Sequence, residues 1–292
     1  MKRRCRRLKI LQPKVAANLR LSVPKGVTSV SQLDVGDRMR FLAGLPQVSR
    51  PIISKWFRQN PDTRQKADLS PVTVADQEIE TALRGVIQKA FPDDEFQGEE
   101  FGSVKTLDAH RFCWVIDPID GTKSFATGKR TFGCLIALLQ DRRPVLGIID
   151  MPALDERWLG IKDQPTLYNG QPCRTAKTPS LQNATLNATT PDMFSPDEWR
   201  VFSRMSEVVR FRQFGADCYA YGLLACGFTD LVLEAGLGRF DYLALVPVIE
   251  GAGGCISDWQ GRPLTFDSAG QALASANETL HARALDFLGS VI

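Results

Sequence analysis

The sequence has 292 residues, of which 43% are hydrophobic and 24% are charged, as is usual for a globular protein. It is long enough for one large domain or two lobes, and no stretch approaches the ~18 apolar residues of a membrane span. The seven cysteines are scattered without a C-x-x-C pair, so the sequence indicates neither a disulfide framework nor a zinc site. We therefore expect a cytoplasmic protein in a reducing environment, with no membrane partner.

Residues 1–33 contain nine Lys and Arg and no acid, so the net charge of +3 comes from this segment and the remainder is slightly acidic. The segment lacks a long apolar run and is therefore not a secretory signal. We interpret it as a basic, disordered extension or as the product of an upstream start codon. An organelle transit peptide and a nucleic-acid-binding arm are the alternatives, and we place no chemistry there.

Residues 34–180 are predicted to form an N-terminal α+β lobe. Apolar residues recur at helical spacing up to residue 56, and Pro46 and Pro51 interrupt them, so a kinked or split first helix is expected. A second helix is predicted over 73–91, with Asp76 in its first turn, where its simplest role is helix capping.

Apolar runs then predict the strands of a sheet flanked by these two helices. The runs cover 95–97, 112–116, 131–139, 144–150 and 157–161. Residues 140–143 are polar and predict a hairpin turn, the Asn-Gly turn at 169–170 extends an antiparallel region, and 103–111 resemble a mobile polar loop.

Residues 181–292 alternate between strand and helix patterns and predict a C-terminal α/β lobe. Predicted elements are a strand at 184–189, a helix from Ser195, a strand at 209–214, a helix at 217–227 and a strand at 230–234. A last helix is expected to be capped by Asp241, kinked at Pro247 and ended by the glycines at 253–254. This lobe supplies Asp241.

Two aspartates follow the most apolar of the predicted strands. Asp117 and Asp120 lie in the run Asp-Pro-Ile-Asp-Gly-Thr, where they would repel each other unless a cation lay between them. A set of oxygen ligands suits a hard ion such as Mg²⁺ better than zinc. The amides of Gly121 and Thr122 could hold a phosphate beside the metal. A simple turn is the alternative.

Three segments carry a family resemblance when they are taken together. They are Gly98-Glu99-Glu100, the run 117–122, and Phe240-Asp241 with the downstream Ala252-Gly253-Gly254. In this order they resemble the three signatures of the inositol monophosphatase family, over roughly residues 35–290. The resemblance implies a layered αβαβα sandwich and Mg²⁺-dependent hydrolysis of a phosphomonoester by water, without a covalent phosphoenzyme.

The resemblance also implies a role for individual residues, with two to three Mg²⁺ ions in one site. The implied ligands are Glu99, Asp117 and the Ile119 carbonyl for the first ion, and Asp117, Asp120 and Asp241 for the second. Asp76 would meet a third, weaker ion and hydrogen-bond Thr122, and this pair would orient the attacking water together with Glu99. The amides of Gly121 and Thr122 would bind the phosphate. Lys66 could add a cation near the water or remain a surface charge.

Within this family, three runs are most similar to the histidinol-phosphate phosphatases. They are Ser70–Asp76, Gly215–Tyr221 and Tyr242–Glu250. Histidinol phosphate carries an ammonium and an imidazole where inositol phosphate has neutral hydroxyls, so an acid at 217 would suit it. We expect Asp217 and Glu234 to bind the amine or imidazole, Tyr219 to pack on the ring, and Asp241 to lie at the substrate. A helix cap is the alternative for Asp217.

We therefore predict a Mg²⁺-dependent histidinol-phosphatase of histidine biosynthesis, acting on a small-molecule phosphate ester. The alternative enzyme is a phosphatase for inositol, nucleotide or sugar phosphates. A binding protein that uses the basic arm on nucleic acid is disfavoured, because it would have no need of four mutually repelling acids. No nucleic-acid partner is expected, and a homodimer is an expectation that rests on the resemblance alone.

Overall fold

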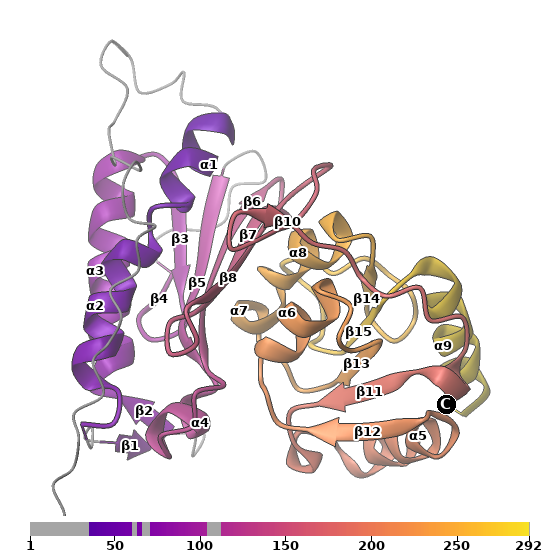
Figure 1. Ribbon diagram of the computed structural model, residues 1–292. Helices are drawn as coiled ribbons and strands as arrows, with labels where there is room; N and C mark the ends of the chain where they lie inside the picture. Colours follow the sequence, from indigo (N-terminus) through magenta and orange to yellow (C-terminus); the bar gives the residue numbers. More distant parts are fainter. Residues whose placement is uncertain (1–34, 60–62, 66–70, 104–111, 292) are drawn as a thin grey trace, which may run out of the picture.

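The computed structural model describes residues 35–59, 63–65, 71–103 and 112–291 (Figure 1). The expectations for 1–33, for Lys66 and for most of the polar loop lie outside these ranges. The described chain forms five layers in the order helices, sheet, helices, sheet, helices (Figure 1), which confirms the expected αβαβα sandwich. No helix in these ranges is long and apolar enough to cross a membrane.

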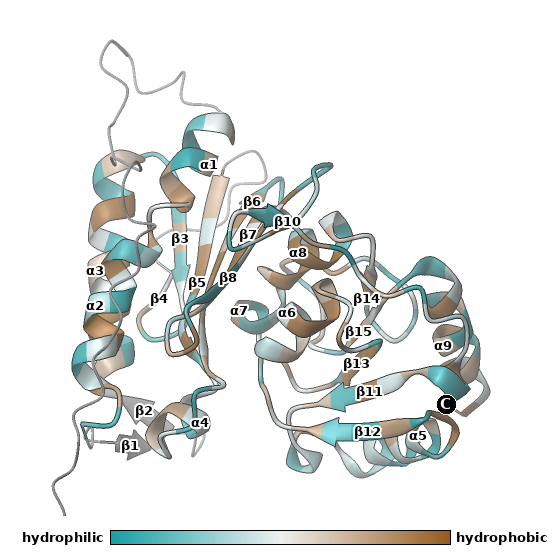
Figure 2. Ribbon diagram, in the orientation of Figure 1, coloured by the Kyte–Doolittle hydropathy of each residue, from teal (hydrophilic) through white to brown (hydrophobic). Residues whose placement is uncertain are grey.

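The first layer contains three helices. They are α1 (Val35–Leu42), α2 (Pro46–Trp56) and α3 (Val74–Ala90). The expected split of the first helix is confirmed: it falls just before Pro46, which begins α2, where proline's missing N–H does not interrupt helical hydrogen bonding. Figure 2 shows α3 banded brown and teal, as expected of a helix with one face on the core.

The first sheet has eight strands in the order β10-β9-β8-β7-β6-β5-β3-β4. They are β3 (Glu95–Gly98), β4 (Gly102–Ser103), β5 (Phe112–Asp120), β6 (Gly133–Gln140), β7 (Arg143–Met151), β8 (Glu156–Ile161), β9 (Leu167–Tyr168) and β10 (Gln171–Pro172). The pairing is antiparallel except between β3 and β5, and the predicted hairpin of β6 and β7 is confirmed. Two short strands, β1 (Thr63–Gln65) and β2 (Pro71–Thr73), pair separately.

Strand β5 reads as an unbroken apolar run because both faces of this sheet are covered. Trp114 and Ile116 enter the core beneath α1, α2 and α3, whereas Cys113 and Val115 enter the core on the opposite face. Successive side chains of a strand point to opposite faces, so a strand between two helix layers must be apolar at every position.

The second half of the chain supplies the remaining three layers. The middle helices are α6 (Tyr219–Ala225), α7 (Arg239–Tyr242) and α8 (Leu245–Gly251). The second sheet has the order β12-β11-β13-β15-β14, with β11 (Thr185–Ala188), β12 (Phe211–Phe214), β13 (Leu231–Glu234), β14 (Cys255–Ser257) and β15 (Ala272–Ser275). The outer helices are α5 (Pro196–Val208) and α9 (Glu278–Val291). The predicted helix start at Ser195 is confirmed, and Ser195 and Glu198 form a capping box there.

Helix α8 approaches the first sheet closely because two of the sheet residues beneath it lack side chains. Gly147 of β7 and Gly160 of β8 are cross-strand partners. A Cβ atom on Gly147 would lie 2.1 Å from the carbonyl oxygen of Ala244, and one on Gly160 would lie 2.3 Å from the backbone of Pro247. This contact brings the preceding helix, α7, to the end of β5.

The last predicted helix differs from expectation in two ways. Asp241 is not the cap of a following helix; it lies inside α7, where its carboxylate accepts a hydrogen bond from the N–H of Gly238 at 2.7 Å. The expected kink is a complete break between α7 and α8, at Leu243 and Ala244. Proline at 247 conflicts with the carbonyl four residues earlier, which is that of Leu243, so the break falls where the proline prevents continuation.

Candidate active site

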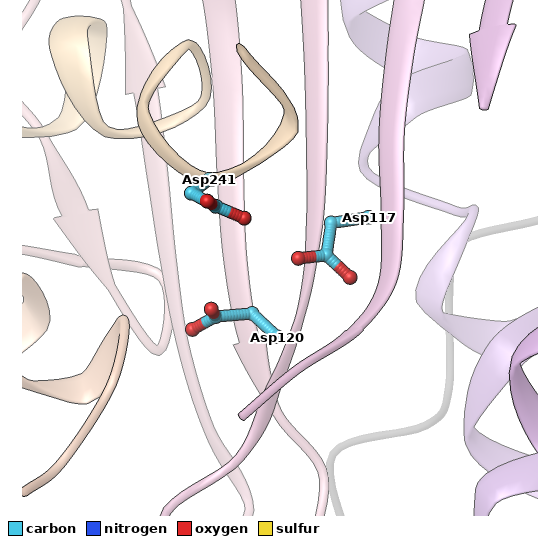
Figure 3. A group of neighbouring side chains, drawn as sticks. All are labelled: Asp117, Asp120 and Asp241. Carbon is cyan, nitrogen blue, oxygen red and sulfur yellow. The ribbon is translucent and has the colours of Figure 1, made fainter. Parts of the chain in front are cut away.

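Asp117 and Asp120 lie at the end of β5, where its pairing with β6 becomes irregular. Residues three apart in a regular strand would face opposite sides of the sheet. The register shifts between these two residues, so the strand can turn both side chains the same way. Figure 3 shows both carboxylates directed toward Asp241 of α7.

The three aspartates form one compact cluster. One carboxylate oxygen from each lies within 4.8 Å of the others. Asp117 is 2% exposed, and its Oδ1 is buried without a hydrogen-bond partner. Asp120 and Asp241 are half-buried, and the Asp120 carboxylate accepts a hydrogen bond from the N–H of Cys218 at 2.6 Å.

The acids of this cluster oppose one another's ionisation. Burial raises the pKa of Asp117 well above its usual range, and the charges of Glu99, Asp120 and Asp241 raise it further. Burial and then Asp217 and Asp241 raise the pKa of Asp120, while the Cys218 N–H acts in the opposite direction. Burial and Glu99 raise the pKa of Asp241 to about 7. A bound cation would relieve this repulsion.

Glu99 reaches the cluster through the parallel pairing of β3 with β5. Gly98 is paired with Ile116, so the next residue on each strand, Glu99 and Asp117, emerges at the same edge of the sheet. The N–H of Glu99 donates to the carbonyl of Ile116 at 3.3 Å. The Glu-Glu segment therefore lies beside the aspartate motif.

The position of Glu99 depends on Glu80, to which the sequence analysis gave no role. Glu80 is fully buried on α3, and its carboxylate accepts hydrogen bonds from the N–H groups of Glu100 at 2.7 Å and Phe101 at 3.4 Å. It also pairs with Arg84 at 2.7 Å. A Cβ atom on Gly98 would overlap this carboxylate, so Glu80 and Gly98 together shape the turn that presents Glu99. The position of Glu80, one helical turn after Asp76 on the same helix, was the signal in the sequence for its place near the site.

Asp76 and Thr122 lie near the cluster, but Thr122 has another partner than expected. Asp76 is 2% exposed in the first turn of α3, and its charge contributes to the raised pKa of Asp117. The hydroxyl of Thr122 donates to the carbonyl of Ile119 at 3.1 Å. Because a hydroxyl carries a single proton, the expected Thr122 to Asp76 hydrogen bond is replaced here by one within the motif.

Gly121 begins the short helix α4 (Thr122–Ala126) and has a φ of 84°, a conformation that favours glycine. Asp217, from the second half of the chain, lies directly against it, since a Cβ atom on Gly121 would be 2.8 Å from Asp217 Oδ2. The same oxygen accepts a hydrogen bond from the Ser124 hydroxyl at 2.9 Å. Asp217 does not occupy the N-cap of α6, which is Cys218, so the helix-cap alternative is wrong.

A cavity of about 170 Å³ opens beside the aspartate cluster. It is lined by Asp120, Thr189, Met193, Asp217, Cys218, Tyr221, Glu234, Leu237, Asp241 and Leu245. Glu234, at the end of β13, is 2% exposed and accepts hydrogen bonds from the N–H of Thr189 at 2.7 Å and from the hydroxyl of Tyr221 at 2.8 Å. The structure thus brings Asp217 and Glu234 to one cavity with Asp241.

Tyr219 does not line this cavity. Its hydroxyl donates to Glu156 at 3.4 Å, and its ring lies 5.9 Å from that of Trp158. Residues two apart in a helix point in nearly opposite directions, so the aromatic residue of α6 that faces the cavity is Tyr221. Tyr221 ends the run Gly215–Tyr221, but no role was predicted for it.

Comparison with known proteins decides the family. The model of the inositol monophosphatase family matches residues 42–290. The chain belongs to the inositol monophosphatase family. A bifunctional phosphatase from Arabidopsis thaliana, IMPL2, described as chloroplastic, is 43% identical over 270 residues, which cover 89% of this chain and 78% of that protein. A histidinol-phosphatase from Chlorobaculum parvum is 32% identical over 235 residues, which cover 80% of this chain and 89% of that protein.

Solved structures of the inositol monophosphatase family share the fold. That of an inositol monophosphatase from Zymomonas mobilis is 41% identical, covers 88% of this chain and 100% of its own, and superposes with a TM-score of 0.80. The protein is therefore a phosphatase that acts on small-molecule phosphate esters. Enzymes of this family are metal-dependent, and the acidic cluster of Asp117, Asp120 and Asp241 is present.

Proposed function

We propose that this phosphatase hydrolyses L-histidinol phosphate to L-histidinol and phosphate, in a Mg²⁺-dependent step of histidine biosynthesis. The observation that carries the proposal is the acidic character of the cavity beside the metal cluster. Its charged lining residues within the described ranges are four carboxylates, Asp120, Asp217, Glu234 and Asp241. Two of these belong to the cluster, which leaves Asp217 and Glu234 for the part of the substrate beyond the phosphate.

An acidic cavity suits the leaving group of histidinol phosphate, which carries an ammonium and an imidazole. Burial raises the pKa of Asp217, and the Ser124 hydroxyl, Lys129 and Lys123 act in the opposite direction. An ammonium beside Asp217 would favour the ionised carboxylate further and form a charge-assisted hydrogen bond. Inositol phosphate offers only neutral hydroxyls and would bring no positive charge of its own to Asp217.

The cluster fits Mg²⁺ on the chemistry of its donor atoms. All of them are oxygens, and a buried oxygen of Asp117 without a hydrogen-bond partner is what a metal ligand looks like before the ion binds. Glu99, Asp117 and the Ile119 carbonyl would hold the first ion. Asp117, Asp120 and Asp241 would hold the second, and Asp76 would meet a third, weaker one.

Bound Mg²⁺ would supply positive charge that makes water more acidic and screens the phosphoryl oxygens. The chain's own residues would orient the reactants. Glu99 and the hydroxyl of Thr122 would hold the attacking water in line with the leaving group, and the amides of Gly121 and Thr122 would bind the phosphoryl oxygens. Rotation of the Thr122 hydroxyl toward Asp76 would release the Ile119 carbonyl for the ion. No covalent phosphoenzyme is involved.

The names of relatives support two substrates within the family. The Chlorobaculum parvum protein is called a histidinol-phosphatase, and the Zymomonas mobilis structure is described as that of an inositol monophosphatase. Inositol monophosphate is therefore the second candidate. The cavity favours histidinol phosphate because Asp217 lies against the phosphate-binding Gly121, where a cationic group next to the phosphate could reach it.

We also propose that the protein works in a reducing compartment, which is the cytoplasm unless residues 1–33 direct import. The Arabidopsis relative is described as chloroplastic, so import is the alternative. Fluorescence microscopy of residues 1–33 fused to a fluorescent protein would distinguish the two. A homodimer is proposed as well, and sedimentation equilibrium on the full chain tests it.

Phosphate release from L-histidinol phosphate, inositol 1-phosphate and adenosine 3',5'-bisphosphate, measured with and without Mg²⁺, tests the proposal. Asp117→Asn is the blank. The proposal requires Mg²⁺-dependent release that is fastest with histidinol phosphate and absent in the blank. If another phosphate is hydrolysed faster, the metal chemistry stands and the substrate assignment is wrong; if none of the three is hydrolysed, the proposed function is wrong.

A further inference from the structure

Two cysteines lie side by side at a distance from the aspartate cluster. Cys173 follows β10, and Cys226 follows α6; both are half-buried, and their thiols interact, since each shifts the pKa of the other. The chains around them pack closely, since a Cβ atom on Gly227 would lie 3.2 Å from the backbone nitrogen of Ala176. Neither cysteine is in a disulfide, and neither lines the cavity.

The surroundings of Cys226 favour its thiolate. The indole N–H of Trp158 donates to its sulfur at 3.1 Å, and the Cys173 thiol is a second donor. The Cys173 hydrogen bond lowers the pKa of Cys226 to about 7, with help from Trp158, while burial opposes the shift. The donor, Cys173, has its own pKa raised. Cys226 is thus the nucleophile of the pair, while the Cys173 thiol stays protonated and lies 3.6 Å from the carbonyl oxygen of Thr166, to which it can also donate.

Three other titratable groups face Cys226. Glu156 of β8 acts weakly against the thiolate, and the phenols of Tyr168 on β9 and Tyr219 on α6 lie near the same sulfur. Burial raises the pKa of both phenols, so they are neutral at neutral pH. The charge state of the thiol pair is therefore set by Cys226 itself near neutrality.

The remaining cysteines of the described chain are inert by comparison. They are Cys113, Cys134, Cys218 and Cys255. Burial raises the pKa of each, and the first three are almost completely buried. Reactivity of a thiol depends on its thiolate fraction and its access to reagent, so Cys226 should react first.

We propose that Cys173 and Cys226 form a reversible disulfide and are a redox modification site whose oxidant is a small-molecule or protein disulfide. The Cys226 thiolate attacks one sulfur of the oxidant and releases a thiolate, which leaves a mixed disulfide on Cys226. Cys173 then gives up its proton and attacks the Cys226 sulfur, releasing the second thiol. Two protein thiols are oxidised by two electrons, and one external disulfide is reduced to two thiols.

This bond would connect the edge of the first sheet, at β10, to helix α6 of the second half of the chain. Helix α6 begins next to Cys218, whose N–H donates to Asp120, and its Tyr221 holds Glu234. A disulfide would therefore fix the far end of the helix that supports the cavity. Closing the loop between residues 173 and 226 should also raise the unfolding temperature of the oxidised protein.

The test treats the reduced, folded full chain with glutathione disulfide, quenches with acid, alkylates the remaining thiols and maps the peptides by mass. The expected result is loss of two thiols and one peptide pair linked through Cys173 and Cys226, reversed by dithiothreitol. The rate should rise with pH with a midpoint at about 7. Cys255→Ser, a matched half-buried control, should behave as wild type.

Variants of the pair give a readout that a structural role would not move. In Cys173→Ala, which leaves no hydrogen-bond donor at this position, Cys226 should stop at a stable glutathione adduct, and its alkylation midpoint should move to higher pH. Cys226→Ser should abolish the reaction at Cys173. The proposal is overturned if the folded wild-type chain keeps both thiols, if either pairs with another cysteine, or if the midpoint of Cys226 is unchanged in Cys173→Ala.

Discussion

Replacing Asp117 by asparagine should stabilise the metal-free protein while abolishing phosphate release. Asp117 is buried beside Asp120 and Asp241, with carboxylate oxygens within 4.8 Å. Two unit charges at that separation repel each other by about 3.5 kcal/mol at an effective dielectric constant of roughly 20. The variant keeps the size of the side chain and removes its charge.

The sign of the pH dependence follows from the raised pKa of Asp117. A folded-state pKa above the unfolded one means that stability is complete below the unfolded pKa and is lost as pH rises through the folded pKa. Protonation of Asp117 in the folded state limits the loss of folding stability to about 4 kcal/mol at neutral pH. This limit corresponds to about 1.36 kcal/mol for each pH unit between ~3.9, the unfolded pKa, and neutrality. We expect a gain of about 3 kcal/mol in the variant, or roughly 6–12 °C at about 2–4 °C per kcal/mol.

Thermal unfolding monitored by circular dichroism, with chelator and with excess Mg²⁺, measures both effects. In wild type, Mg²⁺ at about 100 times its Kd should add about 2.7 kcal/mol, and the variant should lose this response. Asp286→Asn makes the same chemical change on the exposed face of α9. It should change neither the stability of the metal-free protein nor the stabilisation by Mg²⁺. A metal-free Asp117→Asn protein less stable than wild type, still stabilised by Mg²⁺, would refute the reasoning.

Four further variants test the fold and the site. Gly147→Ala should destabilise the protein by more than about 1–3 kcal/mol, because the new methyl group meets the backbone of Ala244. Gly85→Ala, with open space around the new methyl group, should stabilise α3 by up to ~1 kcal/mol. Urea unfolding measures both changes. Glu80→Gln should weaken Mg²⁺ activation about 10–100-fold, since its carboxylate holds the turn that carries the first acidic ligand; an unchanged Mg²⁺ titration contradicts this. Tyr221→Phe removes a hydrogen bond to Glu234 worth about 1.5–3 kcal/mol. It should raise KM for histidinol phosphate more than it lowers kcat. Equal changes in KM and kcat would mean that Glu234 does not act in substrate binding.

Much of the fold was predictable because its signals are local. The apolar run of β5, the prolines of the first helix and the helix start at Ser195 each depend on neighbours in sequence, and the structure confirms all three. The metal cluster was predictable only in part from residues, because Asp117 and Asp120 are three residues apart in one motif while Asp241 comes from a distant part of the chain. The family resemblance supplied that long-range link.

The remaining features depend on contacts that no local pattern encodes. Glu80 resembles any helical acid until the fold places it under the turn after Gly98. Tyr219 and Tyr221 differ only in their direction on α6, which is set by packing of Tyr219 against Trp158. The Thr122 hydroxyl could reach more than one acceptor, and the sequence does not rank them.

The ratio of kcat/KM for L-histidinol phosphate to that for inositol 1-phosphate, in wild type and in Asp217→Asn, tests the central claim most directly. The account predicts a ratio well above one in wild type. It predicts a fall of about 10–150-fold in the variant, the equivalent of a charge-assisted hydrogen bond of about 1.5–3 kcal/mol, with inositol phosphate hydrolysis little changed. A wild-type ratio at or below one, or a ratio unchanged by the substitution, would contradict the account.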